Sequence, residues 1–444
     1  MSERTESSLT RRALLGSVAG ATGLATATTT ATGRTSRTVT PTVMTQNVYL
    51  GVGLTDLVRA ESLSDVREAV GALFDRFEPT LYGARADAFA AAIETADPAV
   101  VALQEVATIR QQQPGDFGNP LGEPASDVVV DFLDRIETAL DERDLDYTVA
   151  AEAVTTDVEL PGATDDGSID VRLTNRDVLL VRDDVDVTST TTGTYDAALR
   201  ASVSGIGVGL TVQRGYAMAD VIVDDVAVTA VSTHLEASAP AIRQQQAREL
   251  LAALPETGPV VVGADLNSTP ADEAYGILTD QLTDAYSEHR PNADGYTCCQ
   301  ADDLRNDESQ LNRRLDTILY RGSVRPTSVS RVGHRESDRL TADIDDETVR
   351  VWPSDHAGVV ATLEITGEVS TATPTPTPTA TATPTPTETA TPTPTPTETA
   401  TPTPSPTELP TDSTATSASG PGFGVLVGLV GLLLGVTRRY RRSE

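Results

Sequence analysis

The stretch Val260–Asn267 (VVVGADLN) decides the fold, because a short β-branched run stops at a glycine and two polar side chains follow it. A short apolar run bounded by a turn is typical of a buried strand in an α/β protein. Catalytic groups gather at the carboxyl ends of such strands. Asp265 and Asn267 are two residues apart, so an extended backbone points both side chains the same way. We therefore expect one edge of a functional site here.

Four other stretches of the chain also end in polar side chains. They are Thr45–Asn47 (TQN), Leu103–Glu105 (LQE), Ser232–His234 (STH) and Ser354–His356 (SDH). If the strands that carry them are neighbours in one sheet or in two packed sheets, the five tips form a single site.

Apolar periodicity predicts the elements between these tips. We expect helices at 56–77, 83–95, 126–140, 239–254 and after Pro270, and strands at 42–49, 99–103, 147–151, 178–181, 208–213, 219–223, 227–232, 315–320, 328–332 and 358–365. Strands outnumber helices and many follow one another directly. This order favours mixed sheets with outer helices over a strictly alternating parallel fold.

The composition is strongly acidic. Among 444 residues there are 65 Asp and Glu against 33 basic residues, all of them arginine, and the formal net charge is -32. Such a surface suits concentrated salt, where the Debye length falls to about 3 Å at 1 M and repulsion is screened. We therefore expect a protein of a salty environment, such as that of a halophilic archaeon. The charge does not exclude a phosphate-bearing substrate, because brine also screens that repulsion.

The two ends of the chain differ from the middle, so we divide it into four parts. Residues 1–40 resemble a twin-arginine export signal, with Arg11-Arg12 before a mildly apolar run. We expect residues 41–366 to form one large domain that carries all five polar tips and any catalytic site. Residues 367–420 are a Thr/Pro-rich linker that cannot build a core. Residues 421–444 contain Pro-Gly-Phe, an apolar run and four arginines.

The tail at 421–444 resembles the PGF-CTERM sorting signal of archaeal surface proteins. The resemblance implies cleavage near the tripeptide and lipid attachment by an archaeosortase-type enzyme. A retained transmembrane helix is the alternative, although the apolar run is short for one. Both readings tether the protein to the outer face of the cell membrane or to the cell surface.

Two of the five tips supply ligands suited to a hard cation. Mg²⁺ prefers oxygen ligands, so one carboxylate helped by an amide oxygen is a plausible anchor, and Glu105 with Asn47 offers that pair. A histidine oriented by a carboxylate can take the proton from attacking water, which contributes about 10²- to 10⁴-fold. His356 with Asp316 fits this task.

The remaining tips would handle the phosphate. We expect Asp265 and Asn267 to position the water and the phosphate, and His234 to contact the phosphate. His234 and His356 are two of only four histidines, and both end a predicted strand motif. Together the tips indicate metal-assisted hydrolysis of a phosphoester.

Six motifs in order carry a resemblance to the endonuclease/exonuclease/phosphatase superfamily, which has the deoxyribonuclease-I-like fold. They are Gln46-Asn47, Leu103–Glu105, Thr233–Leu235, Gly263–Asn267, Leu315–Ile318 and Ser354–His356. The resemblance implies a four-layer α/β sandwich of two packed mixed sheets flanked by helices. It also implies dependence on Mg²⁺, or on Mn²⁺ or Ca²⁺, and in-line attack of water on phosphorus. Glu105 would be the main metal ligand with Asn47 beside it, and Asp355 would lie next to the metal or the phosphate.

The chain departs from the nuclease pattern at one position. Where deoxyribonuclease-I-like nucleases place a glutamate that braces the first catalytic histidine, this chain offers Asn175. A strict duplex nuclease is therefore less well supported. Arg172, Arg176 and Arg214 are candidates for holding phosphate or for ordinary ion pairs. The adjacent Cys298 and Cys299 could form a vicinal bridge or remain thiols.

We expect an exported, monomeric phosphoesterase that hydrolyses a phosphodiester substrate, with extracellular nucleic acid as the favoured substrate. A phospholipase C or sphingomyelinase-like hydrolase, or a phosphatase, is the enzymatic alternative. A surface module that keeps the fold without the chemistry is a third hypothesis. Only 4% of the residues are aromatic, so a platform for stacking single-stranded bases is not indicated.

Overall fold

The computed structural model of this chain describes residues 36–369 apart from 53–56, 58–59, 120, 203–208 and 345–346. The predicted signal segment up to residue 35, the linker from residue 370 onward and the whole sorting tail lie outside the described residues. Among the helices of the described part, none is long and apolar enough to cross a membrane.

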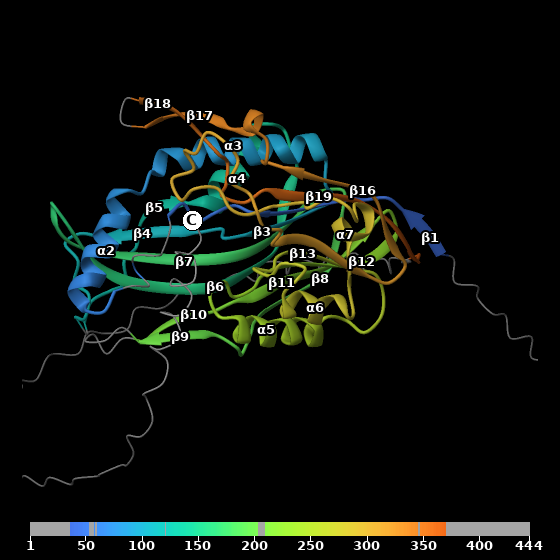
Figure 1. The fold of residues 1–444 in the computed structure, drawn as a ribbon, viewed down its shortest axis with the longest axis horizontal. Coiled ribbons are helices and arrows are strands. Elements are labelled where there is room, and N and C mark those ends of the chain that lie inside the picture. The colour runs from blue at the N-terminus through green and yellow to red at the C-terminus, as the bar shows by residue number, and fades with distance from the viewer. Residues whose placement is uncertain are drawn as a thin grey trace, which may run out of the picture. The chain divides into compact units, whose positions relative to one another are not determined.

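Two mixed sheets form the centre of the fold (Figure 1). The first sheet has the order β1 (Ser36–Val39), β19 (Gly358–Glu368), β2 (Thr42–Asn47), β3 (Val100–Gln104), β7 (Gly167–Arg182), β4 (Thr108–Gln112) and β5 (Asp127–Asp131), with β16 (Val324–Val332) on β19 and β6 (Tyr147–Thr164) on β7. The second has the order β14 (Thr283–Asp284), β15 (Asp316–Arg321), β13 (Val260–Asp265), β12 (Val226–His234), β11 (Gly215–Val223) and β8 (Asp186–Thr194). Parallel pairs, β2 with β3 and β12 with β13, occur in sheets that are otherwise antiparallel.

Helices cover the outer face of each sheet. Helices α3 (Pro79–Ala96) and α4 (Phe132–Asp141) pack on the first sheet through Phe89, Ile93 and Ile136. Helices α5 (Pro240–Ala253) and α6 (Glu273–Thr279) pack on the second through Leu250 and Leu278. A third apolar cluster fills the space between the sheets. The predicted four-layer α/β sandwich is confirmed, and Figure 1 shows α3 and α4 on the opposite side from α5 and α6.

The remaining elements lie outside the two central sheets and the four helices that cover them. They are α2 (Leu63–Asp75), α7 (Ala285–His289), the 3₁₀ turn Glu336–Asp338, the strand pair β9 (Leu199–Ser202) with β10 (Gly209–Val212), and the pair β17 (Leu340–Ile344) with β18 (Glu347–Val351). Ser62 caps α2 by accepting from the backbone N–H of Asp65, whose side chain accepts from the backbone N–H of Ser62 in return.

Gly263 in β13 lets the two sheets approach closely just below the strand tips. A Cβ atom at this position would lie 2.6 Å from the Cβ of Ala102 and 3.0 Å from the Cβ of Thr45, both in the first sheet. Side chains alternate along a strand, so Asp265 faces the same way as Gly263. The glycine therefore brings Asp265 against the ends of β2 and β3, where Asn47 and Glu105 lie.

The predicted helix at 126–140 is wrong in its first third. Residues Asp127–Asp131 form β5, where Val128 is exposed and Val130 is buried, and the helix begins only at Phe132. Asp131 ends the strand and caps α4 by accepting from the backbone N–H of Leu133 at 3.1 Å. A run of three valines suits either element, and pairing with β4 decides for the strand.

The hairpin of β6 and β7 is much longer than the strands predicted at 147–151 and 178–181. Its two strands pair from Tyr147 with Arg182 to Thr164 with Gly167. The outer half contains many polar and charged residues, which hid its strand character from a search for apolar runs. Its extension carries the first sheet beyond the strand tips.

Candidate active site

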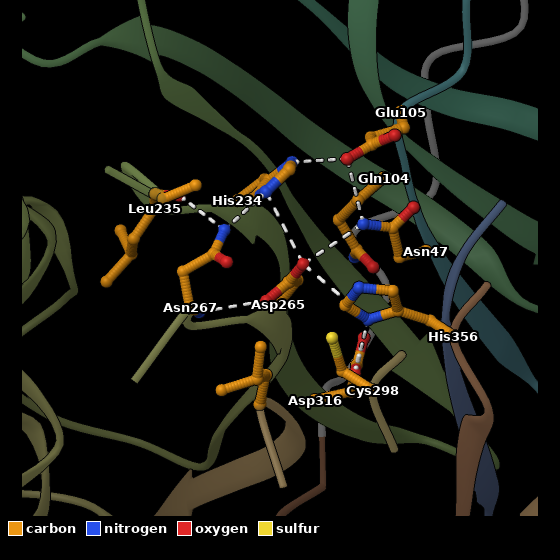
Figure 2. Close-up of polar contacts among 12 residues, drawn as sticks. Asn47, Gln104, Glu105, His234, Leu235, Asp265, Asn267, Cys298, Asp316 and His356 are labelled. Carbon is orange, nitrogen blue, oxygen red and sulfur yellow. Dashed lines mark hydrogen bonds and ion pairs between the residues drawn. The ribbon is translucent and has the colours of Figure 1, made fainter. Parts of the chain in front are cut away.

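The strand tips of both sheets converge on one buried cluster (Figure 2). Asn47, at the end of β2, donates from Nδ2 to Glu105 Oε1 at 3.1 Å and to Asp265 Oδ2 at 3.0 Å. Glu105 follows β3 and Asp265 ends β13, so these two bonds join the first sheet to the second. Gln104 adds another link by donating to Ser232 Oγ at 3.0 Å. The structure thus brings the predicted tips together.

His356 and Asp316 form the shortest polar pair of the cluster, with Nδ1 2.7 Å from Asp316 Oδ2. Asp316 is fully buried and begins β15, directly opposite Asp265 in the antiparallel register. His356 lies in the turn before β19, where its backbone N–H donates to Ser354 Oγ at 3.1 Å. Ser354 in turn donates to the carbonyl oxygen of Asn47 at 2.8 Å. The turn that carries His356 is therefore tied to the end of β2.

Thr297 is a positioning residue that the sequence analysis did not single out. It is fully buried, and its Oγ1 accepts from the backbone N–H groups of Leu315 and Asp316 at 3.0 and 3.1 Å. The long loop before β15 thereby fixes the end of the strand that presents Asp316. No short motif marks such a contact, because it depends on how the loop folds back on its own strand.

The carboxylates around His356 control its proton. Burial alone would lower the pKa of His356, but Asp316, Asp355 and Asp265 outweigh burial and raise the pKa well above 6.5. Burial also raises the pKa of Asp316 to about 6, although His356 opposes this shift. The pair therefore holds one proton strongly between an imidazole and a carboxyl group.

His234 has the opposite character. It is fully buried, and both burial and the neighbouring Arg214 lower its pKa to about 4. Its Nδ1 lies 2.9 Å from Arg214 Nη1, and its Nε2 lies 2.8 Å from Asn267 Nδ2 and 3.4 Å from Asp265 Oδ2. His234 is thus a neutral imidazole at neutral pH, and the fixed positive charge beside it belongs to Arg214.

Of the three arginines considered from the sequence, only Arg214 is close to the cluster. Arg172 pairs with Asp157 at 2.5 Å, and Arg176 pairs with Asp131 at 2.7 Å. Arg214 Nε is buried and makes no hydrogen bond to a described residue, although it lies 4.0 Å from the buried Glu236 Oε2. Lone arginines carry no sequence signal, and only the fold separates Arg214, which directly precedes β11, from the other two.

Asn175 does not brace His234. Its Nδ2 donates to Thr155 Oγ1 at 3.0 Å, and the contacts of the His234 ring come from Arg214 and Asn267 instead. Two residues further along β7, the fully buried Asp177 makes no side-chain hydrogen bond within the described part of the chain. Burial raises the pKa of Asp177 well above its usual range, although the nearby Arg214 opposes this shift.

The donor set fits a divalent cation at Glu105 and Asp355. Both side chains line the same cavity wall. Burial raises the pKa of Asp355 to about 7, with His356 opposing the shift and Glu105, Asp265 and Asp316 adding to it. Desolvated carboxylates gathered in this way favour a bound cation. Asn47 presents its nitrogen to the carboxylates, while its Oδ1 accepts from the backbone N–H of Tyr49 at 2.9 Å.

A second acidic group lies deeper. Ligand atoms of Asp265, Asp316 and His356 all fall within 4.8 Å of one another. Here the ring nitrogen of His356 is already engaged with Asp316. The wall formed by Glu105 and Asp355 is therefore the better place for the cation.

Cys298 and Cys299 are joined in a vicinal disulfide beside His356. Cys299 Sγ lies 3.8 Å from His356 Nε2, and Arg313 Nη2 lies 3.2 Å from each sulfur. The sequence left a bridge and free thiols open, and the structure has the bridge.

A two-sheet sandwich with a histidine–carboxylate pair, a buried acidic cluster and an arginine at the strand ends is suited to phosphoester hydrolysis. Residues 44–356 match the Endonuclease/Exonuclease/phosphatase family, so the chain belongs to this family of phosphoester hydrolases. The family is generally dependent on a divalent metal, in agreement with the acidic cluster.

Solved structures resemble this chain at low identity. A family protein from Bacteroides thetaiotaomicron has 15% identity and a TM-score of 0.47, covering 74% of this chain and 99% of that chain. The mannosyl-6-phosphatase of the same organism has 15% identity and a TM-score of 0.45, covering 73% and 99%. D. rerio TDP2, complexed with a single-strand DNA product, has 16% identity and a TM-score of 0.43, covering 73% and 98%. No curated protein matches this chain.

Proposed function

We propose that this chain is a metal-dependent phosphodiesterase in which water attacks phosphorus in line with the departing ester oxygen. The observation that carries the proposal is the His356–Asp316 pair at 2.7 Å, which faces Asp265 and the acidic wall of Glu105. One P–O bond forms from the water, and one P–O ester bond breaks. The products are a phosphomonoester and an alcohol, and the departing oxygen takes up a proton.

The side chains divide this work by their charges. His356, oriented by Asp316, accepts the proton of the attacking water when its imidazole is neutral. Asp265 and Asn267 position the water and the phosphate, and neutral His234, held between Arg214 and Asn267, borders the phosphate. Arg214 contributes a permanent positive charge to the phosphate.

A bound Mg²⁺, or Mn²⁺ or Ca²⁺, would supply positive charge to the non-bridging oxygens. Glu105 and Asp355 would hold it, and Asn47 would fix the orientation of Glu105 from the side. Leu50 assists by donating its backbone N–H to Glu105 Oε2 at 3.0 Å. These contacts position the metal-binding carboxylate before any cation arrives.

We also propose that the enzyme is a monomer that works outside the cell, exported through the part of segment 1–40 that precedes β1 and tethered through the part of 367–444 that follows β19. The support is sequence alone: the Arg11-Arg12 pair, the Thr/Pro linker and the Pro-Gly-Phe tail. Deleting 421–444 should release the active protein into the medium, and intact-mass measurement should reveal whether an archaeosortase-type enzyme cleaves near Pro421. A deletion variant that stays with the membrane fraction would contradict the tether.

The substrate is a phosphodiester of nucleic acid or of lipid. Arg172 and Arg176 are neutralised by acidic partners, so they offer little charge to a polyanion. A panel of duplex DNA, single-stranded DNA, RNA, bis-p-nitrophenyl phosphate and phospholipid vesicles, assayed in molar salt with Mg²⁺, separates these classes. Activity that survives full chelation by EDTA, or that His356→Ala leaves intact, would refute the mechanism.

A further inference from the structure

An apolar cavity of about 380 Å³ opens directly beside the acidic wall. Glu105, Asp355 and Arg214 line it at the catalytic cluster. Away from the cluster its lining is mostly aliphatic and aromatic, with Leu73, Phe74, Val158, Val171 and Leu173, and it also contains Thr156 and Asn175. The catalytic machinery as described uses none of this apolar surface.

Three elements build the apolar part. Helix α2 supplies Leu73 and Phe74, while the extended hairpin of β6 and β7 supplies Val158 and Leu173. The helix sits tightly on the hairpin, because a Cβ atom at Gly71 would collide with the carbonyl oxygen of Ala163. Figure 1 shows α2 beside the far ends of β4 and β7. The cavity is thus framed by packed secondary structure on at least two sides.

We propose that this cavity holds an alkyl chain carried by an ester oxygen of the phosphate, so that the substrate is an amphiphilic phosphodiester. The inference rests on the proposed phosphodiesterase activity and names its substrate class. The supporting observation is that the proposed cation-binding carboxylates and the apolar side chains line one continuous cavity. A chain bound there keeps its phosphate within reach of Glu105, Asp355 and Arg214.

The size and chemistry of the cavity favour a hydrocarbon chain over a base. A volume of about 380 Å³ falls within the roughly 300–1,000 Å³ typical of small-molecule sites. A nucleobase carries donors and acceptors along its edges, and Thr156 and Asn175 could meet only a few of them, so those that lie against Val158, Val171 and Leu173 would be buried at a cost. A methylene chain has no such groups and gains from leaving water.

The test is a series of p-nitrophenyl alkyl phosphates with methyl, butyl, octyl and dodecyl chains, kept below their micellar concentrations in molar salt with Mg²⁺. Complete burial would raise kcat/KM by at most about fourfold for each methylene. Because the cavity is partly open, each methylene is only partly buried and contributes less than this. We therefore expect kcat/KM to rise at least about tenfold from the methyl to the octyl ester. A flat series with a measurable rate for the methyl ester would overturn the inference and leave the phosphodiesterase intact.

A cavity-filling variant and a matched control test whether the dependence of kcat/KM on chain length arises in this cavity. Val158→Trp should lower the ratio of octyl to methyl kcat/KM by about tenfold, because the indole occupies the space of the chain. Val187→Trp places the same side chain on β8, where Val187 is 40% exposed and does not line the cavity, and should keep the wild-type ratio. Equal ratios in both variants would overturn the inference.

Binding without turnover separates this inference from the enzymatic one. In EDTA, dodecylphosphonate should raise the Tm of the wild-type protein, and methylphosphonate at the same concentration should not. The shift should shrink in Val158→Trp and persist in Val187→Trp. Tight binding with no hydrolysis of any ester would refute the proposed function alone. Hydrolysis of polynucleotides together with no shift for dodecylphosphonate would refute the lipid substrate and favour a nuclease.

Discussion

Replacing Asp316 by asparagine removes the carboxylate that orients His356 and preserves its shape. In the wild-type protein this carboxylate is fully buried and lies 2.7 Å from Nδ1, so the bond is charge-assisted and shielded from water. An amide in its place can hold the imidazole in the wrong tautomer, with no charge to stabilise the proton that His356 accepts. We expect kcat/KM for bis-p-nitrophenyl phosphate to fall by about 10²- to 10⁴-fold, or about 3 to 5 kcal/mol of transition-state stabilisation.

The pH profile gives a second, independent readout of Asp316→Asn. Because Asp316 raises the pKa of His356, its loss should lower that pKa. The reacting base must be neutral, so the wild-type rate should still be rising above pH 7, and the ascending limb should move to lower pH in the variant. A loss of activity with an unmoved limb would contradict this role.

Two comparisons guard against simple misfolding of Asp316→Asn. Asp284→Asn also removes a buried carboxylate near β15, one that binds Thr317 and Tyr275, and it should cost stability without shifting the pH limb. The double variant Asp316→Asn with His356→Ala should be about as slow as His356→Ala alone, because the two residues act as a unit. If the two substitutions lowered kcat/KM additively, or if Asp316→Asn lowered it less than about tenfold, the proposed cooperation of His356 and Asp316 would be refuted.

Four further changes test other parts of the structure. Gly263→Ala should destabilise the protein by about 1–3 kcal/mol in denaturant unfolding, because its Cβ would lie 2.6 Å from Ala102, whereas Gly276→Ala in the open on α6 should be neutral or stabilising. Arg214→Gln should lower kcat/KM by about 10- to 100-fold through lost charge at the phosphate and should raise the pKa of His234 measured by NMR, and an unchanged histidine titration would contradict the contact. Asp177 binds its proton more tightly in the folded than in the unfolded protein, so its contribution to stability falls as the pH rises above about 4. The increase in Tm caused by Asp177→Asn should therefore be larger at pH 8 than at pH 5. EDTA should abolish hydrolysis, and Mg²⁺ should restore it.

The strands that carry the chemistry could be read from the sequence because they are buried on both faces. Continuous apolar runs such as Val260–Val262 and Val100–Leu103 leave few alternatives to a central strand. The polar residues that interrupt them then fall at strand ends, which predicted the grouping of Glu105, Asp265 and His356. The helix expected at 126–140 failed for the same reason, since three valines at 128–130 support either element.

Contacts made by residues outside the strand-end motifs were beyond prediction. Arg214 is one arginine among many until β11 pairs with β12 and brings it beside His234. Thr297 gains its task only when the loop folds back on β15. The outer half of β6 and β7 lacks an apolar pattern because one face is exposed, so the hairpin length and the cavity it forms with α2 had no local signature.

The residues that could be predicted from the sequence carry out the chemistry, and those that could not be predicted determine which substrate binds. The reacting groups sit on strand ends whose spacing depends on backbone period and on one close approach at Gly263. The cavity wall depends on the packing of α2 against an extended hairpin, and a change in either alters its shape without moving Asp265 or His356. Substitutions such as Val158→Trp should therefore change which ester is hydrolysed while the pH dependence set by His356 and Asp316 stays as it is. A shift in that pH profile would mean that the two parts are coupled.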